Sequence, residues 1–257
     1  MSYHRVLQIS DTHLLESPGA KFFRQDVDAN LVSTLNAVNS SGPFHLVILT
    51  GDISQDGSAA SYQRVSDMLD NMEFENLIAI PGNHDDPSTL SKFLPITSCV
   101  LPPWIIIPLD SHWPHHVEGR LIEDELNRVQ SVLDDIELSP EIRFVSVAVH
   151  HPPHFNCAAP NCTLAEPEAL LKLTRHDAVR LLISGHVHDD YTHQVGATLF
   201  STCPSTCIGF DHNPAGHRTT NLPPGAIIYD LHDDGSVSRR AVYARKQSDP
   251  SGKSEVN

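Results

Sequence analysis

Five short clusters of side chains that bind metal ions recur along the chain. They stand at residues 11–13 (Asp-Thr-His), 51–52 (Gly-Asp), 82–85 (Gly-Asn-His-Asp), 150–151 (His-His) and 185–188 (Gly-His-Val-His). Imidazole, carboxylate and amide ligands together suit Mn, Fe or Zn better than Ca, which prefers oxygen alone, or Cu(I), which prefers sulfur. The clusters therefore predict a transition-metal site, of the kind that activates water for hydrolysis.

The spacing within each cluster indicates how its side chains would share ions. In Asp11-x-His13 the two side chains of an extended segment point the same way, so the carboxylate and the imidazole could bind one ion. The same holds for residues 186–188, but a kink after Gly185 would let the two imidazoles serve two different ions. Asp52 has two carboxylate oxygens and could bridge two ions.

Each cluster alone also has a simpler interpretation. Residues 11–13 could hold a surface or capping pair, and residues 51–52 or 82–85 could form a turn. Residues 185–188 directly follow a buried strand and are harder to explain in this way. The occurrence of all five clusters in one chain favours the metal site.

Short apolar runs precede the clusters and predict the strands that position them. We expect strands at residues 6–9, 46–49, 77–80, 104–109, 144–149 and 179–183. Because these runs are continuously apolar, both faces of each sheet should be covered. Five of the six runs lead into a cluster, and sites in open α/β sheets form beyond the carboxyl ends of strands. The clusters could therefore converge on one crevice.

Apolar residues at helical spacing alternate with these strands. This spacing predicts helices around residues 27–38, 62–72 and 126–136. Alternating strands and helices indicate an α/β architecture. Strand-like pieces follow at residues 197–201, 226–231 and 237–243, and we expect them to be mostly antiparallel. We expect one domain over residues 1–245 and a polar, flexible tail over residues 246–257.

Composition and charge exclude several classes of protein. With 257 residues, of which 40% are hydrophobic and 19% charged, the chain is typical of a globular protein. Its formal charge of −15 disfavours nucleic acid and anionic lipid as partners. No apolar run reaches the length of a membrane span, and residues 1–16 lack the features of a signal peptide. We therefore expect a cytoplasmic protein, monomeric or dimeric, with no membrane partner.

Residues outside the clusters leave several interpretations open. We interpret the five cysteines as mostly structural thiols, with a Cys157–Cys162 pair as the alternative. Residues 112–116 favour a solvated loop, with a place at the rim of the site as the alternative. Residues 202–207 favour a packed turn, with a loop that closes over a substrate as the alternative. His154 and Asn156 follow the double histidine and could touch a substrate.

The five clusters, in this order, resemble the pattern of the calcineurin-like metallophosphoesterase superfamily, which is Asp-x-His, Gly-Asp, Gly-Asn-His-Asp/Glu, His and Gly-His-x-His. The likeness spans about residues 6–190. More narrowly, the chain is similar to the class III bacterial 3′,5′-cyclic AMP phosphodiesterases at residues 7–14, 109–111, 119–121, 150–153 and 201–207. This narrower likeness extends to about residue 243.

The resemblance implies a fold and a metal centre. The fold would be a four-layer αββα sandwich with a mixed sheet and antiparallel C-terminal strands. Two divalent ions, Fe²⁺ and/or Mn²⁺ or alternatively Zn²⁺, would lie at the strand ends. The resemblance implies that the first ion is bound by Asp11, His13 and His188. The second ion would be bound by Asn83, His150 and His186, and both ions would be bridged by Asp52. In the double histidine, His150 would be the ligand and His151 would support it.

The resemblance also implies roles in catalysis and binding. His84 would contact the phosphate and either stabilise charge or protonate the leaving oxygen, and Asp85 would orient its imidazole. The phosphate of AMP would lie against five side chains, those of His13, Asp52, Asn83, His84 and His188.

These residues lead to one leading hypothesis and two alternatives. The leading hypothesis is hydrolysis of 3′,5′-cyclic AMP to 5′-AMP by attack of a metal-bridging hydroxide. The first alternative is a general hydrolase of glycerophosphodiesters or other phosphodiesters, because the surrounding loops set selectivity on a shared metal core. The second is a non-catalytic metal- or nucleotide-binding regulator, which ranks last because binding alone would not require His84.

Overall fold

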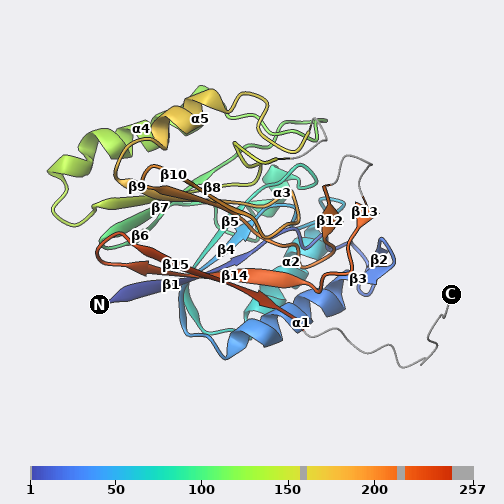
Figure 1. The fold of residues 1–257 in the computed structure, drawn as a ribbon. Helices are drawn as coiled ribbons and strands as arrows, with labels where there is room; N and C mark the ends of the chain where they lie inside the picture. Colours follow the sequence, from blue (N-terminus) through green and yellow to red (C-terminus); the bar gives the residue numbers. More distant parts are fainter. Residues whose placement is uncertain (1, 157–160, 213–217, 245–257) are drawn as a thin grey trace.

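Two stacked β-sheets form the centre of the molecule, and helices cover their outer faces (Figure 1). The computed structural model describes residues 2–156, 161–212 and 218–244, so the expected tail lies outside the described residues. The layers follow the order helix, sheet, sheet, helix, which confirms the expected four-layer αββα sandwich.

The first sheet holds the strands that lead into three of the clusters. Its order is β15-β14-β1-β4-β5, with β1, β4 and β5 parallel and β14 and β15 antiparallel. The strands are β1 (Tyr3–Ile9), β4 (Phe44–Thr50), β5 (Phe74–Ile80), β14 (Gly225–His232) and β15 (Val237–Tyr243). The apolar runs at residues 6–9, 46–49 and 77–80 therefore form strands as predicted.

The second sheet holds the strands that lead into the other two clusters. Its order is β10-β11-β9-β8-β7-β6, and its four inner strands are parallel. The strands are β6 (Cys99–Leu101), β7 (Trp104–Leu109), β8 (Phe144–Val149), β9 (Val179–Ser184), β10 (Thr192–Val195) and β11 (Thr198–Thr202). Strand β11 pairs antiparallel with β10 and parallel with β9, and β14 and β15 pair antiparallel. The expectation of mostly antiparallel C-terminal strands is therefore confirmed, with the β11–β9 pair as the exception.

Helices α1 and α2 begin where a side chain accepts a hydrogen bond from the first turn. Asp26 accepts from the N–H of Ala29 at the start of α1, and Ser58 accepts from the N–H of Ser61 at the start of α2. The helices are α1 (Val27–Asn39), α2 (Ala59–Leu69), α3 (Pro87–Leu90), α4 (Glu123–Asp135) and α5 (Glu168–Leu173), and a 3₁₀ turn spans Ile136–Leu138. The three predicted helices therefore form as α1, α2 and α4.

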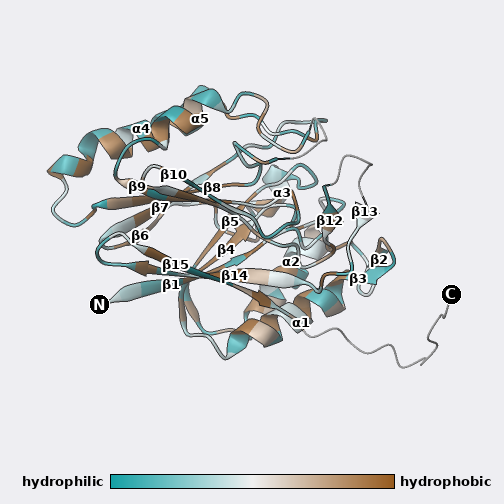
Figure 2. Cartoon of the chain, viewed as in Figure 1, coloured by the Kyte–Doolittle hydropathy of each residue, from teal (hydrophilic) through white to brown (hydrophobic). Residues whose placement is uncertain are grey.

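Three apolar cores separate the four layers. One lies between the first sheet and helices α1 and α2, one between the sheets, and one between the second sheet and helices α4 and α5. Figure 2 shows the apolar residues along the strands and on the inner faces of the helices. Both faces of each sheet are therefore covered, as the continuous apolar runs predicted.

Two short hairpins project beside the carboxyl ends of β1 and β4. The first joins β2 (Lys21–Phe22) to β3 (Gln25–Asp26), and the second contains β12 (Phe210–Asp211) and β13 (Arg218–Thr219). Both hairpins lie at the same end of the molecule (Figure 1). The short apolar and polar runs that form them were not predicted from the sequence.

Two remaining expectations concern cysteines and membranes. Cys99, Cys203 and Cys207 are free and buried, but Cys162 is disulfide-bonded, so the interpretation as thiols is wrong for Cys162. Cys157 lies outside the described residues. Within the described part of the chain, no helix has the length and apolarity that crossing a bilayer requires.

Candidate metal centre

The five clusters meet at the carboxyl ends of the parallel strands. Residues 11–13 follow β1, residue 52 follows β4, and residues 83–84 follow β5. From the second sheet, residues 150–151 follow β8 and residues 186–188 follow β9. Their carboxylate oxygens and imidazole nitrogens form groups in which all the atoms lie within 4.8 Å of one another. The sequence-predicted ligands are thus brought together at the edge where parallel strands end.

The first group consists of Asp11, His13 and His188, all buried. The Nε2 atoms of His13 and His188 lie 3.1 Å apart, and Asp11 Oδ1 lies 3.3 Å from His188 Nε2. Each Nδ1 donates elsewhere, from His13 to Gln55 Oε1 at 2.8 Å and from His188 to the Ile208 carbonyl at 2.6 Å. In neutral imidazoles the two Nε2 lone pairs therefore face one another beside a carboxylate, an arrangement that fits a bound cation.

The second group contains His150, His151 and His186, and their nitrogens differ in availability. His150 Nδ1 donates to the Thr50 carbonyl at 2.7 Å, and its buried Nε2 has no hydrogen-bond partner among the described residues. His151 uses both nitrogens, since Nδ1 accepts from the Ser111 hydroxyl at 2.8 Å and Nε2 donates to the Val117 carbonyl at 3.0 Å. His150 therefore has the open nitrogen of the pair.

The side chains of His186 and Asn83 are expected at the same candidate ion position as His150. His186 Nε2 donates to the Asn161 carbonyl at 2.9 Å, which leaves Nδ1 as the lone-pair atom of the neutral ring. Asn83 Oδ1 is buried and has no hydrogen-bond partner within the described residues. A buried amide oxygen without a donor is unfavourable, and a cation would satisfy it. The residues of this side therefore also fit a metal ion.

Asp52 lies between the two candidate ion positions. Its Oδ2 is 3.8 Å from His13 Nε2 and 3.5 Å from His150 Nε2, while Oδ1 accepts from the backbone N–H of His84 at 2.9 Å. The carboxylate is buried, with its second oxygen facing one imidazole of each side. One side chain can thus contact both candidate ion positions.

The protonation of these groups follows from burial and from their neighbours. Burial lowers the pKa of His13 and that of His186 to about 4, so both are neutral at pH 7 and available as ligands. Burial acts to raise the pKa of Asp52, but His150 and His13 hold this pKa well below its usual range. Burial acts to lower the pKa of His150, but the Asp52 carboxylate raises it to about 9. An ion on His150 would therefore displace a proton.

The backbone brings the ligands together by turns rather than by extended segments. Five non-glycine residues of the centre have left-handed φ angles between 48° and 67°, namely Asp11, His13, Asp52, His186 and His188. The expected extended geometry of Asp-x-His is therefore wrong, although the two side chains still converge. Residues 186 and 188 serve different groups, as expected for a kink after Gly185.

The predicted role of Asp85 is contradicted by its contacts. Its buried carboxylate accepts from the backbone N–H groups of residues 53, 54 and 82 and from the Tyr62 hydroxyl at 3.0 Å. The His84 imidazole is instead contacted by Gln55, whose Nε2 donates to His84 Nδ1 at 3.1 Å. Asp85 therefore stabilises the turn by accepting backbone hydrogen bonds, and Gln55 orients the His84 ring. Sequence analysis missed Gln55 because an amide side chain carries no metal-binding signature.

A cavity of about 640 Å³ opens onto both groups. Its lining includes His13, Asp52, Asn83, His84 and His188, the residues expected beside the phosphate. Its walls include three phenylalanines that sequence analysis did not single out, which are Phe22, Phe23 and Phe210.

Other residues expected near the site lie elsewhere. His154 stacks on His193, with ring centroids 5.2 Å apart, and does not line this cavity; nor does Asn156. Residues 112–116 form the expected loop, and residues 202–207 are buried in a packed turn. In that turn, the Ser205 hydroxyl donates to the Asp11 carbonyl at 2.7 Å.

Comparison with known proteins identifies the class that this fold and site define. The family model of the calcineurin-like phosphoesterases matches residues 4–190. The chain belongs to this family, which uses a dinuclear metal centre. This confirms the expected class of metal-dependent phosphodiesterase.

Curated relatives and solved structures agree with this assignment. The chain is 34% identical over 230 residues to a probable cyclic nucleotide phosphodiesterase of Synechococcus sp., covering 85% of this chain and 88% of the relative. It is 30% identical over 242 residues to the 3′,5′-cyclic adenosine monophosphate phosphodiesterase CpdA of Pseudomonas aeruginosa, covering 90% and 87%. A dimetal phosphatase from Danio rerio has the same fold, with a TM-score of 0.66 at 16% identity, covering 94% and 99%.

Proposed function

We propose that the protein hydrolyses 3′,5′-cyclic AMP to 5′-AMP at a centre of two divalent metal ions. The observation that carries this proposal is the position of Asp52 Oδ2 between His13 Nε2 and His150 Nε2, at 3.8 and 3.5 Å. The proposed ligands are those expected from the sequence, with Asp11, His13 and His188 for one ion, Asn83, His150 and His186 for the other, and Asp52 for both. Fe²⁺ and Mn²⁺ suit this mixed donor set, and Zn²⁺ is the alternative.

The chain's own residues would divide the work of catalysis. When bound, the two ions would activate a water molecule and neutralise charge on the phosphate oxygens. Asp52 and the imidazoles would hold the ion positions, and their buried surroundings would strengthen these interactions. The carbonyls of Thr50 and Ile208 fix the tautomers of His150 and His188, so that each Nε2 faces the centre.

His84 is proposed to stabilise the charge that develops on the leaving 3′-oxygen, by donating a hydrogen bond from Nε2. Its Nδ1 accepts from Gln55, so the neutral ring carries its proton on Nε2. The ring lines the cavity, and its backbone N–H is held by Asp52 Oδ1 at 2.9 Å. The backbone of His84 is therefore hydrogen-bonded to the proposed bridging residue, and this bond would place the His84 ring beside the reacting phosphate.

The substrate assignment is supported by the names of the relatives and by the size of the cavity. Several relatives at 25–34% identity carry names of cyclic nucleotide or cyclic AMP phosphodiesterases. A cavity of about 640 Å³ lies in the range of small-molecule sites and accommodates a nucleoside monophosphate. A cytoplasmic location stays a prediction, as does the oligomeric state.

A hydrolysis panel tests the proposal. The full chain would be loaded with Mn²⁺, or with Fe²⁺ under anaerobic conditions, and incubated with 3′,5′-cyclic AMP, 2′,3′-cyclic AMP, glycerophosphocholine and bis(p-nitrophenyl) phosphate. We expect 5′-AMP from 3′,5′-cyclic AMP with the highest kcat/KM of the panel. A higher kcat/KM for glycerophosphocholine would instead establish a general phosphodiesterase and overturn the cyclic AMP assignment.

A further inference from the structure

Three phenylalanine rings form one wall of the cavity above the metal centre. Phe22 stacks on the His13 ring, with centroids 5.1 Å apart, and Phe210 stacks on the His188 ring at 4.6 Å. Phe23 stands edge-on to both phenylalanines, at 4.6 Å from Phe22 and 6.1 Å from Phe210. The wall therefore lies directly beside the imidazoles of the first metal group.

Phe23 differs from the other two rings in its packing. Phe22 and Phe210 pack against the core beneath the first sheet, whereas Phe23 is 53% exposed and belongs to no core cluster among the described residues. An exposed phenylalanine at the mouth of a cavity leaves aromatic surface open to a ligand. Its position is therefore not explained by packing of the fold.

The backbone at Phe23 is also unfavourable for its side chain. Phe23 and Arg24 form the two-residue turn of the β2–β3 hairpin, with φ angles of 45° and 65°. Glycine and asparagine are the usual residues in such left-handed turns, because a bulky side chain strains them. Strained residues of this kind concentrate at ligand-binding sites. The turn thus presents an exposed aromatic ring at a cost to the fold.

We propose that Phe23 is the stacking platform for the purine base of the cyclic nucleotide. This inference rests on the proposed function, since it places the phosphate beside His13 and His84, and it adds the residue that recognises the base. The Phe22 and Phe210 rings hold Phe23 edge-on, so one of its faces remains for the base. Stacking depends on aromatic area, so the site accepts guanine as well as adenine and disfavours diesters without a base.

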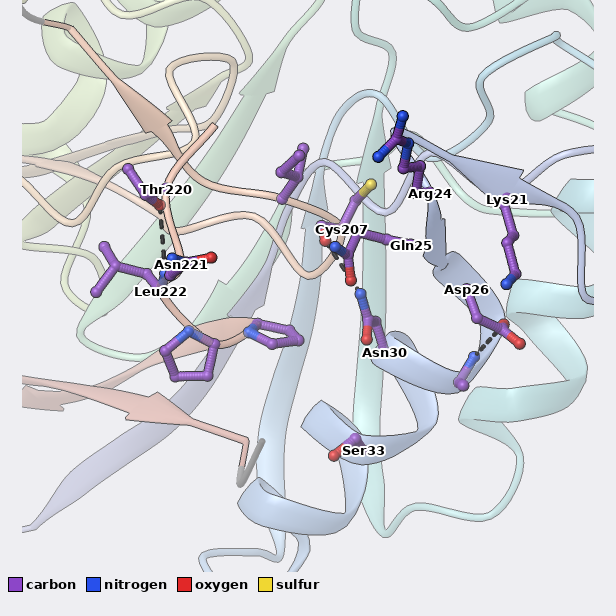
Figure 3. A pocket seen from close by; sticks show the side chains of 14 residues that line it. Lys21, Arg24, Gln25, Asp26, Asn30, Ser33, Cys207, Thr220, Asn221 and Leu222 are labelled. Carbon is purple, nitrogen blue, oxygen red and sulfur yellow. Dashed lines mark hydrogen bonds between the residues drawn. The ribbon is translucent and has the colours of Figure 1, made fainter. Parts of the chain in front are cut away.

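The neighbouring Arg24 provides a matched control within the same turn. Arg24 lines a separate cavity of about 370 Å³, together with Lys21 and Asn30 (Figure 3). It is not among the residues that line the metal cavity. Its left-handed φ is equally unfavourable for a long side chain. Phe23→Asn and Arg24→Asn therefore relieve similar backbone strain, but only the first removes the platform.

The kinetic test compares these variants on two substrates in the Mn²⁺-loaded protein. One substrate is 3′,5′-cyclic AMP, and the other is its analogue in which hydrogen replaces the base. We expect Phe23→Asn to lower kcat/KM for cyclic AMP about tenfold and to leave the base-free analogue unchanged. Arg24→Asn should change kcat/KM for both substrates by the same factor. Phe23→Tyr should keep the wild-type ratio of kcat/KM between the two substrates. Equal losses on both substrates in Phe23→Asn would overturn the proposal.

Two further measurements separate the platform from general damage and from the proposed function. Thermal unfolding should show that Phe23→Asn is no less stable than the wild type. Calorimetric titration should show that AMP binds more tightly than ribose 5-phosphate, and that Phe23→Asn removes this difference. If the wild type fails to hydrolyse cyclic AMP but keeps a Phe23-dependent preference for AMP, the proposed function fails and the platform stands. If cyclic AMP is hydrolysed and Phe23→Asn behaves as the wild type, the platform fails and the proposed function stands.

Discussion

The two histidines of the turn after β9 allow a sharp test of the dinuclear centre. His186 and His188 are separated by one residue, yet His188 groups with Asp11 and His13, whereas His186 groups with His150. We expect His186→Ala and His188→Ala each to remove one metal ion and to leave the other, because Asp52 and the ligands of the opposite side remain. Metal analysis of protein dialysed after Mn²⁺ loading should give two ions per wild-type chain and about one ion per variant chain.

The stabilisation of the folded state by each bound ion can be measured by thermal unfolding. An ion at a hundredfold excess over its Kd stabilises the folded state by about 2.7 kcal/mol. For a domain of this size, 1 kcal/mol raises Tm by about 2–4 °C, so each occupied site should add about 5–11 °C relative to protein in EDTA. Mn²⁺ should therefore raise the Tm of either variant by about half as much as that of the wild type.

A histidine outside the centre supplies the control. The His116 ring is exposed and stacks on Trp113 at 3.5 Å, so His116→Ala should keep two ions and the full shift in Tm. Two outcomes would refute the reasoning. If either histidine variant loses both ions, the two sides do not bind independently; if neither variant loses an ion, the groups seen in the structure are not ligands.

Three further substitutions test single residues. His84→Ala should lower kcat by about 10²- to 10⁴-fold while metal content stays at two ions per chain, and loss of metal would show that His84 is a ligand. Asp52→Asn should abolish both the metal content and the Mn²⁺-dependent rise in Tm, so a variant that retains both would exclude the bridging role. Asp85→Ala should lower the free energy of unfolding by about 3 kcal/mol or more in urea, because it strands three backbone donors and the Tyr62 hydroxyl; unchanged stability would contradict this.

The strands that carry the site could be predicted because they are buried on both faces. The run at residues 46–49 becomes the centre of β4, where Leu46, Val47, Ile48 and Leu49 are all essentially inaccessible to solvent. Short edge elements carry no comparable signal. All four residues of β10 are exposed, and the β2–β3 hairpin has strands of two residues, so pairing rather than hydrophobicity defines them. The parallel pairing of β11 with β9 was also not predicted, because apolar patterning does not encode the direction of a neighbouring strand.

The types of the site residues could be predicted, but their partners could not. Asp85 stands beside His84 in the sequence, and this adjacency suggested that it orients the ring. The turn directs its carboxylate instead towards backbone N–H groups of residues 53 and 54, at 3.1 and 2.8 Å. Gln55, which joins His13 to His84, comes from the turn after a different strand. Such contacts depend on how two turns lie against each other, which residue spacing does not encode.

The strained turns of the centre are held in place by the pairing of the segments that follow β1 and β4. The N–H groups of Asp11, His13 and Leu14 donate to carbonyls of residues 51–53, at 3.0, 2.9 and 3.1 Å. Left-handed residues persist only where surrounding structure determines them, and these bonds fix one ligand segment against the bridging residue. Gly82 completes the arrangement, because a Cβ there would collide with the Asp52 carboxylate. The backbone hydrogen bonds and the close packing at Gly82 therefore position the ligand segments, which is the support from surrounding residues that a precise metal site requires.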